Sequence, residues 1–338
     1  MESFKWTSRA LLIAIAIIGI GAETFGAQRG PTPVRRQRGP ESVTTGRENL
    51  RMCLAEATAN PQSPDAQHRL GRAYLDVVVD GTYGPLGLAD AQKAINAFKE
   101  AIALKPDFAE AYEGLGEAYD DLDDANTHVN HFKEKVEAYR QAIRLKPDYA
   151  EAYLYLADTY EDEENYQEAI ELYKHLLRIK PDNYEAQHYL GNAYSHTGRL
   201  DDALNAYKQA ILINPDDPSA FLSLGLILTT SERYEEAIAF CKAVIDKHPK
   251  SLQAYTSLGN FNASLNRYGD AIRAYKEAIL IKPDDDYAHY CLGVSYVAIG
   301  KRAEALEEYK ALLAIEEKKK PVDGLKATSL ISSDGLRG

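Results

Sequence analysis

Histidines are the residues of this sequence that come closest to the pattern of a metal site. His128 and His131 are three residues apart and lie near two aspartates, a spacing that could hold a metal ion. His188 and His196 are two turns apart on one predicted helix. The segment around His128 is rich in Asp, Asn and His, which is more typical of a solvated surface. We therefore predict no metal ligand.

The cysteines do not predict covalent or redox chemistry. Cys53, Cys241 and Cys291 are too scattered for a disulfide framework or a zinc site. Cys291 is a lone thiol with no evident base or resolving partner. No catalytic constellation appears in the sequence, and residues 320–338 leave no room for an added catalytic domain. We expect a protein that is not an enzyme and that carries no cofactor.

Composition and charge narrow the class of protein. The 338 residues include 39 Lys and Arg against 51 Asp and Glu, which gives a net charge of −12. Hydrophobic residues make up 45% and charged residues 27%, as in a soluble folded protein. The acidic balance argues against a general nucleic-acid binder, because no basic excess is available to neutralise phosphates.

The first 27 residues predict a targeting segment. Lys5 and Arg9 precede an apolar run over residues 10–22, whose 13 residues fall short of the roughly 20 needed to span a bilayer. A short basic stretch before such a run is typical of a secretory signal. We predict an exported protein, periplasmic or secreted, or one anchored in the membrane through residues 1–27. An anchored protein that faces the cytoplasm is the alternative.

Residues 28–46 are rich in Pro, Gly and Arg, and they predict a flexible linker. After it, a pattern repeats. Prolines recur every 34 residues from Pro147 to Pro283, a period that indicates a helical solenoid. Each period holds a Leu followed by a small residue, and five of them later hold an Ala followed four residues on by an aromatic. The Leu–small pairs are Leu70-Gly71, Leu115-Gly116, Leu156-Ala157, Leu190-Gly191, Leu224-Gly225, Leu258-Gly259 and Leu292-Gly293.

This pattern resembles the tetratricopeptide repeat (TPR). The resemblance implies an all-α protein, an α-solenoid in which seven helix-turn-helix repeats stack as a right-handed superhelix. The repeats cover residues 64–108, 109–149, 150–183, 184–217, 218–251, 252–285 and 286–319. Residues 47–63 predict a half-repeat that caps the array, and residues 320–338 follow it as a tail. Two positions depart from the pattern, with Lys135 in place of the small Ala and Cys241 in place of the aromatic.

Two insertions and three helix starts add detail. Glycines in an insertion over residues 77–88 predict a loop, and an insertion over residues 120–132 could lengthen its hairpin. Asp107, Asp148 and Asp182 each precede a Glu by three residues, which is the spacing of a capping box with Asp as the N-cap.

The resemblance implies a partner bound in a concave groove that is lined by the first helix of each repeat. The groove residues pass from acidic to neutral and apolar. They are Glu113, Glu117, Asp120, Tyr155, Asp158, Glu161, Asp162, His188, Asn192, Leu222, Leu226, Asn260, Tyr287, Tyr290 and Val294. We predict a protein or peptide partner with a basic segment and apolar anchors. Alternatively, acidic residues in first turns favour the helix dipole, and the tail covers the last repeat.

Two specialised groove types are missing from this sequence. The Lys and Asn clamp of co-chaperone members is absent, as is the asparagine ladder of glycosyltransferase arrays. We therefore predict a non-enzymatic protein-binding scaffold for a cell-envelope or exported complex. The alternatives are an accessory, non-catalytic subunit of an enzyme such as a glycosyltransferase, and a structural spacer.

Overall fold

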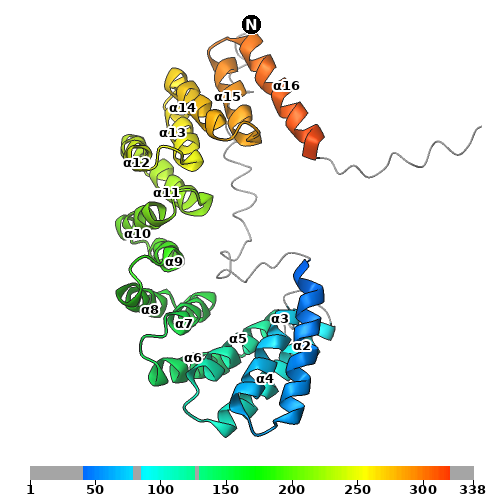
Figure 1. The fold of residues 1–338 in the computed structure, drawn as a ribbon. Helices are drawn as coiled ribbons and strands as arrows, with labels where there is room; N and C mark the ends of the chain where they lie inside the picture. Colours follow the sequence, from blue (N-terminus) through cyan, green and yellow to red (C-terminus); the bar gives the residue numbers. More distant parts are fainter. Residues whose placement is uncertain (1–40, 79–84, 126–128, 320–338) are drawn as a thin grey trace, which may run out of the picture. The chain divides into compact units, whose positions relative to one another are not determined.

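The computed structural model describes residues 41–78, 85–125 and 129–319, which form helices and turns without a β-strand (Figure 1). The helices of these residues are α2 (Glu41–Ala59), α3 (Pro64–Val78), α4 (Pro85–Leu104), α5 (Ala109–Ala125), α6 (Phe132–Leu145), α7 (Ala150–Asp162), α8 (Tyr166–Ile179), α9 (Tyr184–His196), α10 (Leu200–Ile213), α11 (Pro218–Thr230), α12 (Tyr234–Lys247), α13 (Leu252–Ser264), α14 (Tyr268–Ile281), α15 (Asp286–Ala298) and α16 (Arg302–Lys319).

The helices form two compact units that meet in sequence at Gly198 and Arg199. In unit 1, α3 pairs with α4, α5 with α6 and α7 with α8, and α2 packs on α3. In unit 2, the pairs are α11 with α12, α13 with α14 and α15 with α16. Each second helix also packs on the first helix of the next pair, as α4 does on α5 and α14 on α15. The all-α solenoid predicted from the sequence is confirmed.

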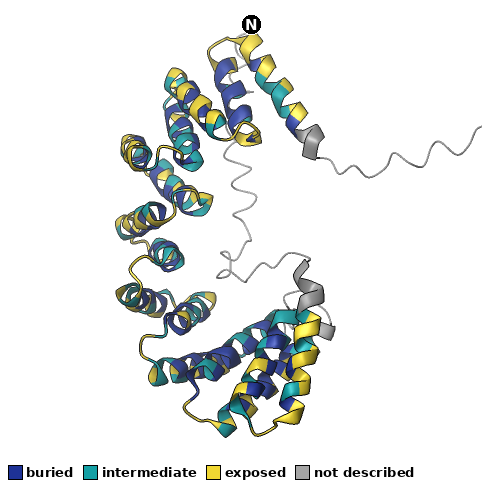
Figure 2. Cartoon of the chain, in the orientation of Figure 1, coloured by how far each residue is buried: buried dark blue, intermediate teal, exposed yellow. Residues whose placement is uncertain are grey.

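A small residue on the first helix of a pair lies against an aromatic ring on the second. A Cβ atom added at Gly116 would lie 2.5 Å from the ring of Tyr139, and one at Gly259 would lie 2.4 Å from the ring of Tyr275. Only a residue without a side chain lets these helices approach so closely. Both tyrosines are fully buried. In the paired helices, the residues coloured as buried gather on the sides that face each other (Figure 2).

Cys241 stands where most repeats have an aromatic residue, and a ring from the next repeat fills the space that it leaves. Cys241 is buried but too small to fill the space of the usual aromatic. The nearest atom to a Cβ added at Gly225 belongs to Phe261 of α13, at 3.4 Å. Phe261 is itself buried. The next first helix therefore supplies the ring that this pair lacks.

The predicted N-caps are wrong by one residue. The N-cap of α9 is Asn183, whose Oδ1 accepts a hydrogen bond from the backbone N–H of Ala186 at 2.7 Å. Asp182 precedes it. Helix α7 has Tyr149 as its N-cap, without a side-chain hydrogen bond, so Asp148 lies outside that helix. Asn has the short acceptor that this position requires, and it stands where the backbone enters the helix.

The turn between the two helices of a pair contains a residue whose backbone is in the left-handed conformation, with a positive φ. Gly198 and Gly300 take φ of 72° and 78°, and both close a first helix. Glu164, Glu232 and Asn266 take φ between 56° and 58° at the equivalent positions, 34 residues apart. A non-glycine residue in this region carries backbone strain, which the packing of the paired helices must outweigh.

Several predicted segments lie partly or wholly outside the described residues. The targeting segment, most of the linker, His128 and the tail are among them. Helix α2 begins at Glu41, inside the predicted linker. The first insertion extends α4 to 20 residues, and the second extends α5 to 17. Among the described helices, none combines the length and apolar character needed to cross a membrane.

Candidate functional site

Two glutamates of α5 share one arginine of α3. Arg72 forms ion pairs with Glu113, at 3.5 Å from Oε2, and with Glu117. The hydroxyl of Tyr149 donates to Glu113 Oε2 at 3.3 Å. Burial raises the pKa of the Glu113 carboxyl to about 7, although Arg72 acts in the opposite direction. This part of the predicted acidic face is therefore partly neutralised by the protein itself.

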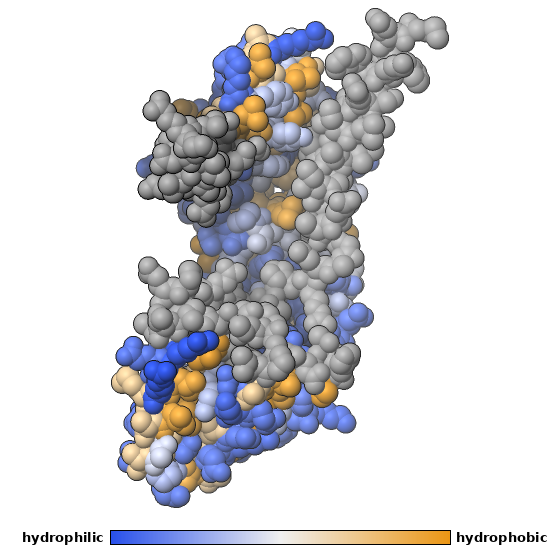
Figure 3. Space-filling model, turned by 90° about the vertical axis from the view of Figure 1, so that its right-hand side faces the viewer, coloured by the Kyte–Doolittle hydropathy of each residue, from blue (hydrophilic) through white to orange (hydrophobic). Residues whose placement is uncertain are grey.

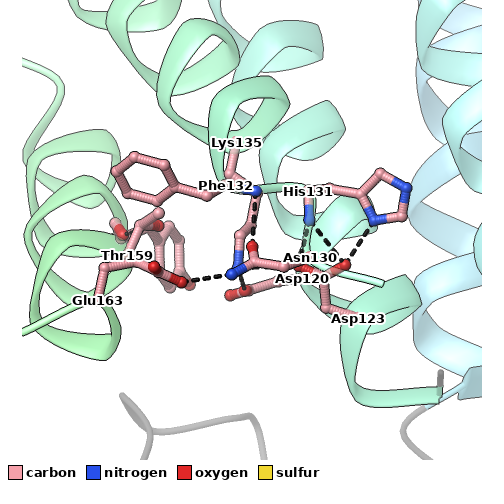
Figure 4. A network of polar contacts seen from close by, with 9 residues as sticks. Asp120, Asp123, Asn130, His131, Phe132, Lys135, Thr159 and Glu163 are labelled. Atoms are coloured by element: carbon pink, nitrogen blue, oxygen red, sulfur yellow. Dashed lines mark hydrogen bonds and ion pairs between the residues drawn. The ribbon is translucent and has the colours of Figure 1, made fainter. Parts of the chain in front are cut away.

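Lys135 lies between two aspartates at the end of α5 (Figure 4). Its Nζ is 2.9 Å from Asp120 Oδ1 and 3.1 Å from Asp123 Oδ2. Burial disfavours the ammonium, but the two carboxylates outweigh it and raise the pKa of Lys135. The departure from the repeat pattern at Lys135 thus gives Asp120 an internal counter-ion.

The histidines considered as metal ligands have other contacts. His131 donates its backbone N–H to Asp123 Oδ2 at 3.0 Å, and its ring Nδ1 is 2.5 Å from Asp123 Oδ1. The ring of His196 stacks on that of Tyr166 at 4.6 Å between centroids. Within the described ranges, no three His, Cys, Asp or Glu side chains converge as metal ligands.

The carboxylates of α7 differ in their partners. Glu161 Oε2 accepts a hydrogen bond from the Tyr173 hydroxyl at 2.8 Å, and burial raises the pKa of Glu161 to about 7. Asp158 is half-buried and has no hydrogen bond or ion pair with any described residue. Burial, followed by the negative charges of Asp162 and Asp120, raises the pKa of Asp158 well above its usual range. A ligand cation near Asp158 would stabilise the charged form of this carboxylate.

Aromatic stacking buries the middle of the predicted groove. Tyr155 stacks on Tyr139 with 5.9 Å between ring centroids, and the buried Tyr139 hydroxyl has no hydrogen-bond partner in the described part of the chain. His188 is buried and stacks on Tyr184 at 6.0 Å. Asn192 is half-buried on the same helix, α9. His188 therefore presents little surface to a ligand.

Helix α11 in unit 2 exposes two leucines one turn apart. Leu222 is 57% exposed and Leu226 is 47% exposed. The residues equivalent to Leu222 in three other repeats are Leu154, His188 and Thr256, and all three are buried. Figure 3 shows hydrophobic side chains in patches between hydrophilic ones on the face that it draws. The α11 leucines are the most solvent-accessible of the predicted groove residues with an aliphatic side chain.

A hydrogen-bonded pair joins the next two first helices of unit 2. Asn260 of α13 donates from Nδ2 to the Tyr287 hydroxyl of α15 at 2.9 Å, and its Oδ1 accepts from the Tyr275 hydroxyl at 2.8 Å. Tyr290 and Val294 of α15 are half-buried. The structure therefore brings these predicted residues of α13 and α15 onto adjoining helices.

The thiols lie in surroundings that suppress reactivity. Burial raises the pKa of Cys291 to about 11, against the hydrogen bonds from Tyr287 and Tyr275. Burial also raises the pKa of Cys241 to about 12 and that of Cys53. Few thiolates are present at neutral pH, which fits a packing role for all three cysteines.

Sequence reasoning missed the internal partners of the acidic residues. The predicted groove residues did not include Arg72, although Arg72 occupies in its repeat the position that Glu117 occupies in the next repeat. Opposite charges at equivalent positions of adjacent repeats were the signal that could have found this pair. The bond from Tyr173 to Glu161 had no such signal, because nearly every repeat carries an aromatic at that position.

Sequence profiles decide the family. Profiles described as tetratricopeptide repeats match residues 90–123, 134–184, 160–227, 218–246 and 259–300, together more than half of the chain. The chain belongs to the tetratricopeptide repeat family. The TPR repeats and the exposed first-helix residues characterise a protein–protein interaction scaffold, and the TPR fold is typically non-catalytic.

Solved TPR structures show limited similarity. A crystal structure of MamA is 29% identical over 48% of this chain and 96% of that chain, with a TM-score of 0.39. MamA from Desulfovibrio magneticus RS-1 is 20% identical over 51% of this chain and 97% of that chain, with a TM-score of 0.39. YrrB, a TPR protein with an unusual peptide-binding site, is 20% identical over 54% of this chain and 95% of that chain, with a TM-score of 0.38. No curated protein sequence matches the chain.

Proposed function

We propose that this TPR scaffold binds a segment of a partner protein on the first-helix face of unit 2, with Leu222 and Leu226 as the anchoring surface. The observation that carries the proposal is the exposure of both leucines on α11, where three other repeats bury the residue equivalent to Leu222. Apolar side chains of a partner would remove this surface from water, and each buried methylene contributes about 0.8 kcal/mol.

A basic residue of the partner is proposed to bind Asp158 in unit 1. Asp158 has no internal counter-ion at hydrogen-bond distance within the described residues, whereas Glu117 and Asp120 are paired with Arg72 and Lys135. A bound ammonium or guanidinium would favour the charged carboxylate and lower its raised pKa. We therefore expect the basic segment of the partner to bind at the end of α7 and not along the whole acidic face.

The setting of the partner complex is proposed to be the cell envelope or the exterior of the cell. The basic and apolar pattern of residues 1–27 supports this setting. Protease treatment of intact cells is the test, since an exported array should be digested. A protected array that retains its amino terminus would contradict export and favour the anchored protein that faces the cytoplasm.

A pull-down with three full-length baits tests the binding face. The first is the unchanged chain, the second carries Leu222→Gln and Leu226→Gln, and the third carries Leu280→Gln as the matched control. Leu280 is 74% exposed on α14, a second helix of the same unit. We expect the double variant to lose a partner that the unchanged chain and the control retain, with the circular dichroism of all three alike. Retention of the same partner by all three baits would refute the proposed face.

The same experiment separates the accessory-subunit alternative. A stoichiometric enzyme among the captured proteins, with activity that co-purifies, would favour an accessory subunit of an enzyme such as a glycosyltransferase. A structural or secretory partner would favour the assembly scaffold. Direct titration of the identified partner segment against Asp158→Asn, with Asp182→Asn as control, then tests the basic contact.

A further inference from the structure

Gly225 of α11 is more exposed than the equivalent glycines of the other first helices. Gly225 is half-buried, whereas the glycine that follows the leucine is buried in the other repeats that have one. Those glycines are Gly71, Gly116, Gly191, Gly259 and Gly293. A position that the repeat normally closes is therefore open to solvent on α11.

The ring that normally covers this glycine is missing from the pair of α11 and α12. A Cβ atom added at Gly259 would lie 2.4 Å from the ring of Tyr275, on the second helix of the same pair. At Gly225 that second helix carries Cys241 instead. Apart from its own helix backbone and chain neighbours, only two atoms of the described residues lie within 4 Å of a Cβ added there, and they are Cζ and Cε1 of Phe261 at 3.4 and 3.8 Å. Phe261 fills the space beside Cys241, yet only the edge of its ring reaches Gly225.

Gly225 forms the floor of a hole on the surface of α11. Residues i, i+3, i+4 and i+7 of a helix enclose such a hole, which a side chain of a facing segment can enter. On α11 these residues are Leu222, Gly225, Leu226 and Thr229, and we call them the α11 hole. Both leucines are exposed and Thr229 is half-buried. The α11 hole therefore has apolar sides, and at Gly225 no side chain blocks it.

We propose that the α11 hole binds an aromatic side chain of the partner, which packs on Gly225 between Leu222 and Leu226. This inference rests on the proposed function, because the same leucines form the anchoring surface, and it names the chemistry of the anchor. In four other pairs a Phe or Tyr ring is the nearest neighbour of the equivalent glycine. The partner would supply from outside the ring contact that Cys241 does not provide.

An aromatic anchor fits this hole better than an aliphatic one for two reasons. A ring is flat, so it can lie against a glycine backbone and contact the leucines on both sides. It also buries a large apolar area with few rotatable bonds, so little conformational entropy is lost on binding. Aromatic residues are accordingly common among the side chains that carry most of the binding energy at protein interfaces.

Fluorine NMR of a small aromatic probe with the full-length chain tests the proposal. The probe is the N-acetyl amide of para-fluorophenylalanine, and the N-acetyl amide of trifluoroleucine is the aliphatic comparison. We expect the unchanged chain to broaden the aromatic signal and to bind the aliphatic probe severalfold more weakly. Gly225→Leu fills the α11 hole and should lower the affinity for the aromatic probe about tenfold. Gly269→Leu is the matched control on α14 of the same unit, where an added Cβ meets nothing within 4 Å, and it should leave the affinity unchanged.

A smaller substitution keeps the test valid if Gly225→Leu disturbs the fold. The Cβ of Gly225→Ala makes ordinary contact with Phe261, so this variant should fold normally and lower the affinity for the aromatic probe about threefold. Circular dichroism of all variants checks the fold. The proposal is overturned if the unchanged chain does not broaden the aromatic signal, if Gly225→Ala binds the aromatic probe as tightly as the unchanged chain, or if the two probes bind equally well.

The pull-down separates this inference from the proposed function. Loss of a captured partner with Leu222→Gln and Leu226→Gln, but its retention with Gly225→Leu, would overturn the aromatic anchor and leave the proposed face standing. Retention of the partner by all baits, with the fluorine broadening still lost in Gly225→Leu, would refute the proposed function and keep the α11 hole as a site that binds an aromatic ring.

Discussion

Adding one methyl group at Gly259 tests the close packing that joins the two helices of a pair. The new Cβ would lie 2.4, 2.7 and 2.7 Å from three ring atoms of Tyr275. Carbon atoms pack best at about 3.5–4.0 Å, so either the ring or α13 must move. Such overpacking of a core costs about 1–3 kcal/mol of the free energy of unfolding.

Gly225→Ala is the matched control, because Gly225 occupies the same position one repeat earlier. There the nearest atom to the added Cβ is in Phe261, at 3.4 Å, which is ordinary contact. Both substitutions gain about 0.5–1 kcal/mol from the helix preference of Ala over Gly, so this gain cancels in the comparison. The predicted difference between the two variants is therefore about 1–3 kcal/mol, with Gly225→Ala the more stable.

The assay is urea unfolding of the full-length variants, followed by far-UV circular dichroism. Long repeat arrays depart from two-state unfolding, so the urea curve can contain more than one transition. Hydrogen exchange identifies the transition in which unit 2 unfolds, and the two variants are compared on that transition. In the background of Tyr275→Cys, which copies the cysteine at position 241, Gly259→Ala should lose its cost. Equal stability of Gly259→Ala and Gly225→Ala would refute the packing argument.

Three further predictions concern charge and thiols. Lys135→Ala should lower the free energy of unfolding by about 3–5 kcal/mol, because it leaves two partly buried aspartates without their cation. The control Lys180→Ala removes an exposed ion pair and should lower it by only about 0–1 kcal/mol. Equal losses of the two variants in urea unfolding would contradict this prediction. Because burial raises the pKa of Glu113 to about 7 in the folded state, that state binds more protons than the unfolded chain above about pH 4.5, so the contribution of Glu113 to stability should fall by about 3 kcal/mol as pH rises through this window. Glu113→Gln should remove this contribution and make the slope shallower, while the raised pKa of Glu161 maintains part of it. An unchanged slope in pH-dependent melting of the variant would reject the assignment. In the native protein at neutral pH, all three cysteines should resist alkylation, and they should react fully once the chain is unfolded, which mass spectrometry can measure. Fast alkylation of Cys291 in the folded state would contradict the packing role and favour a redox role for this thiol.

Local sequence determined the repeat and its helices. The Leu–small pair and the Ala–aromatic step are spaced for one face of a helix, and prolines mark the breaks between hairpins. Such signals are short-range, because each repeat buries its apolar surface only against its neighbours. For the same reason the sequence predicted the all-α solenoid without an account of any long-range contact.

Tertiary structure alone decided which predicted groove residues are available to a partner. Glu117 and Leu226 occupy equivalent positions in their repeats, yet Glu117 is paired with Arg72, whereas Leu226 lies open to solvent. Exposure and ion pairing depend on side chains from adjacent helices, which lie 15 residues away along the chain for Lys135 and Asp120 and 45 residues away for Arg72 and Glu117. The sequence therefore determined the position of each residue on its helix, and the packing of neighbouring helices determined what that residue can still bind.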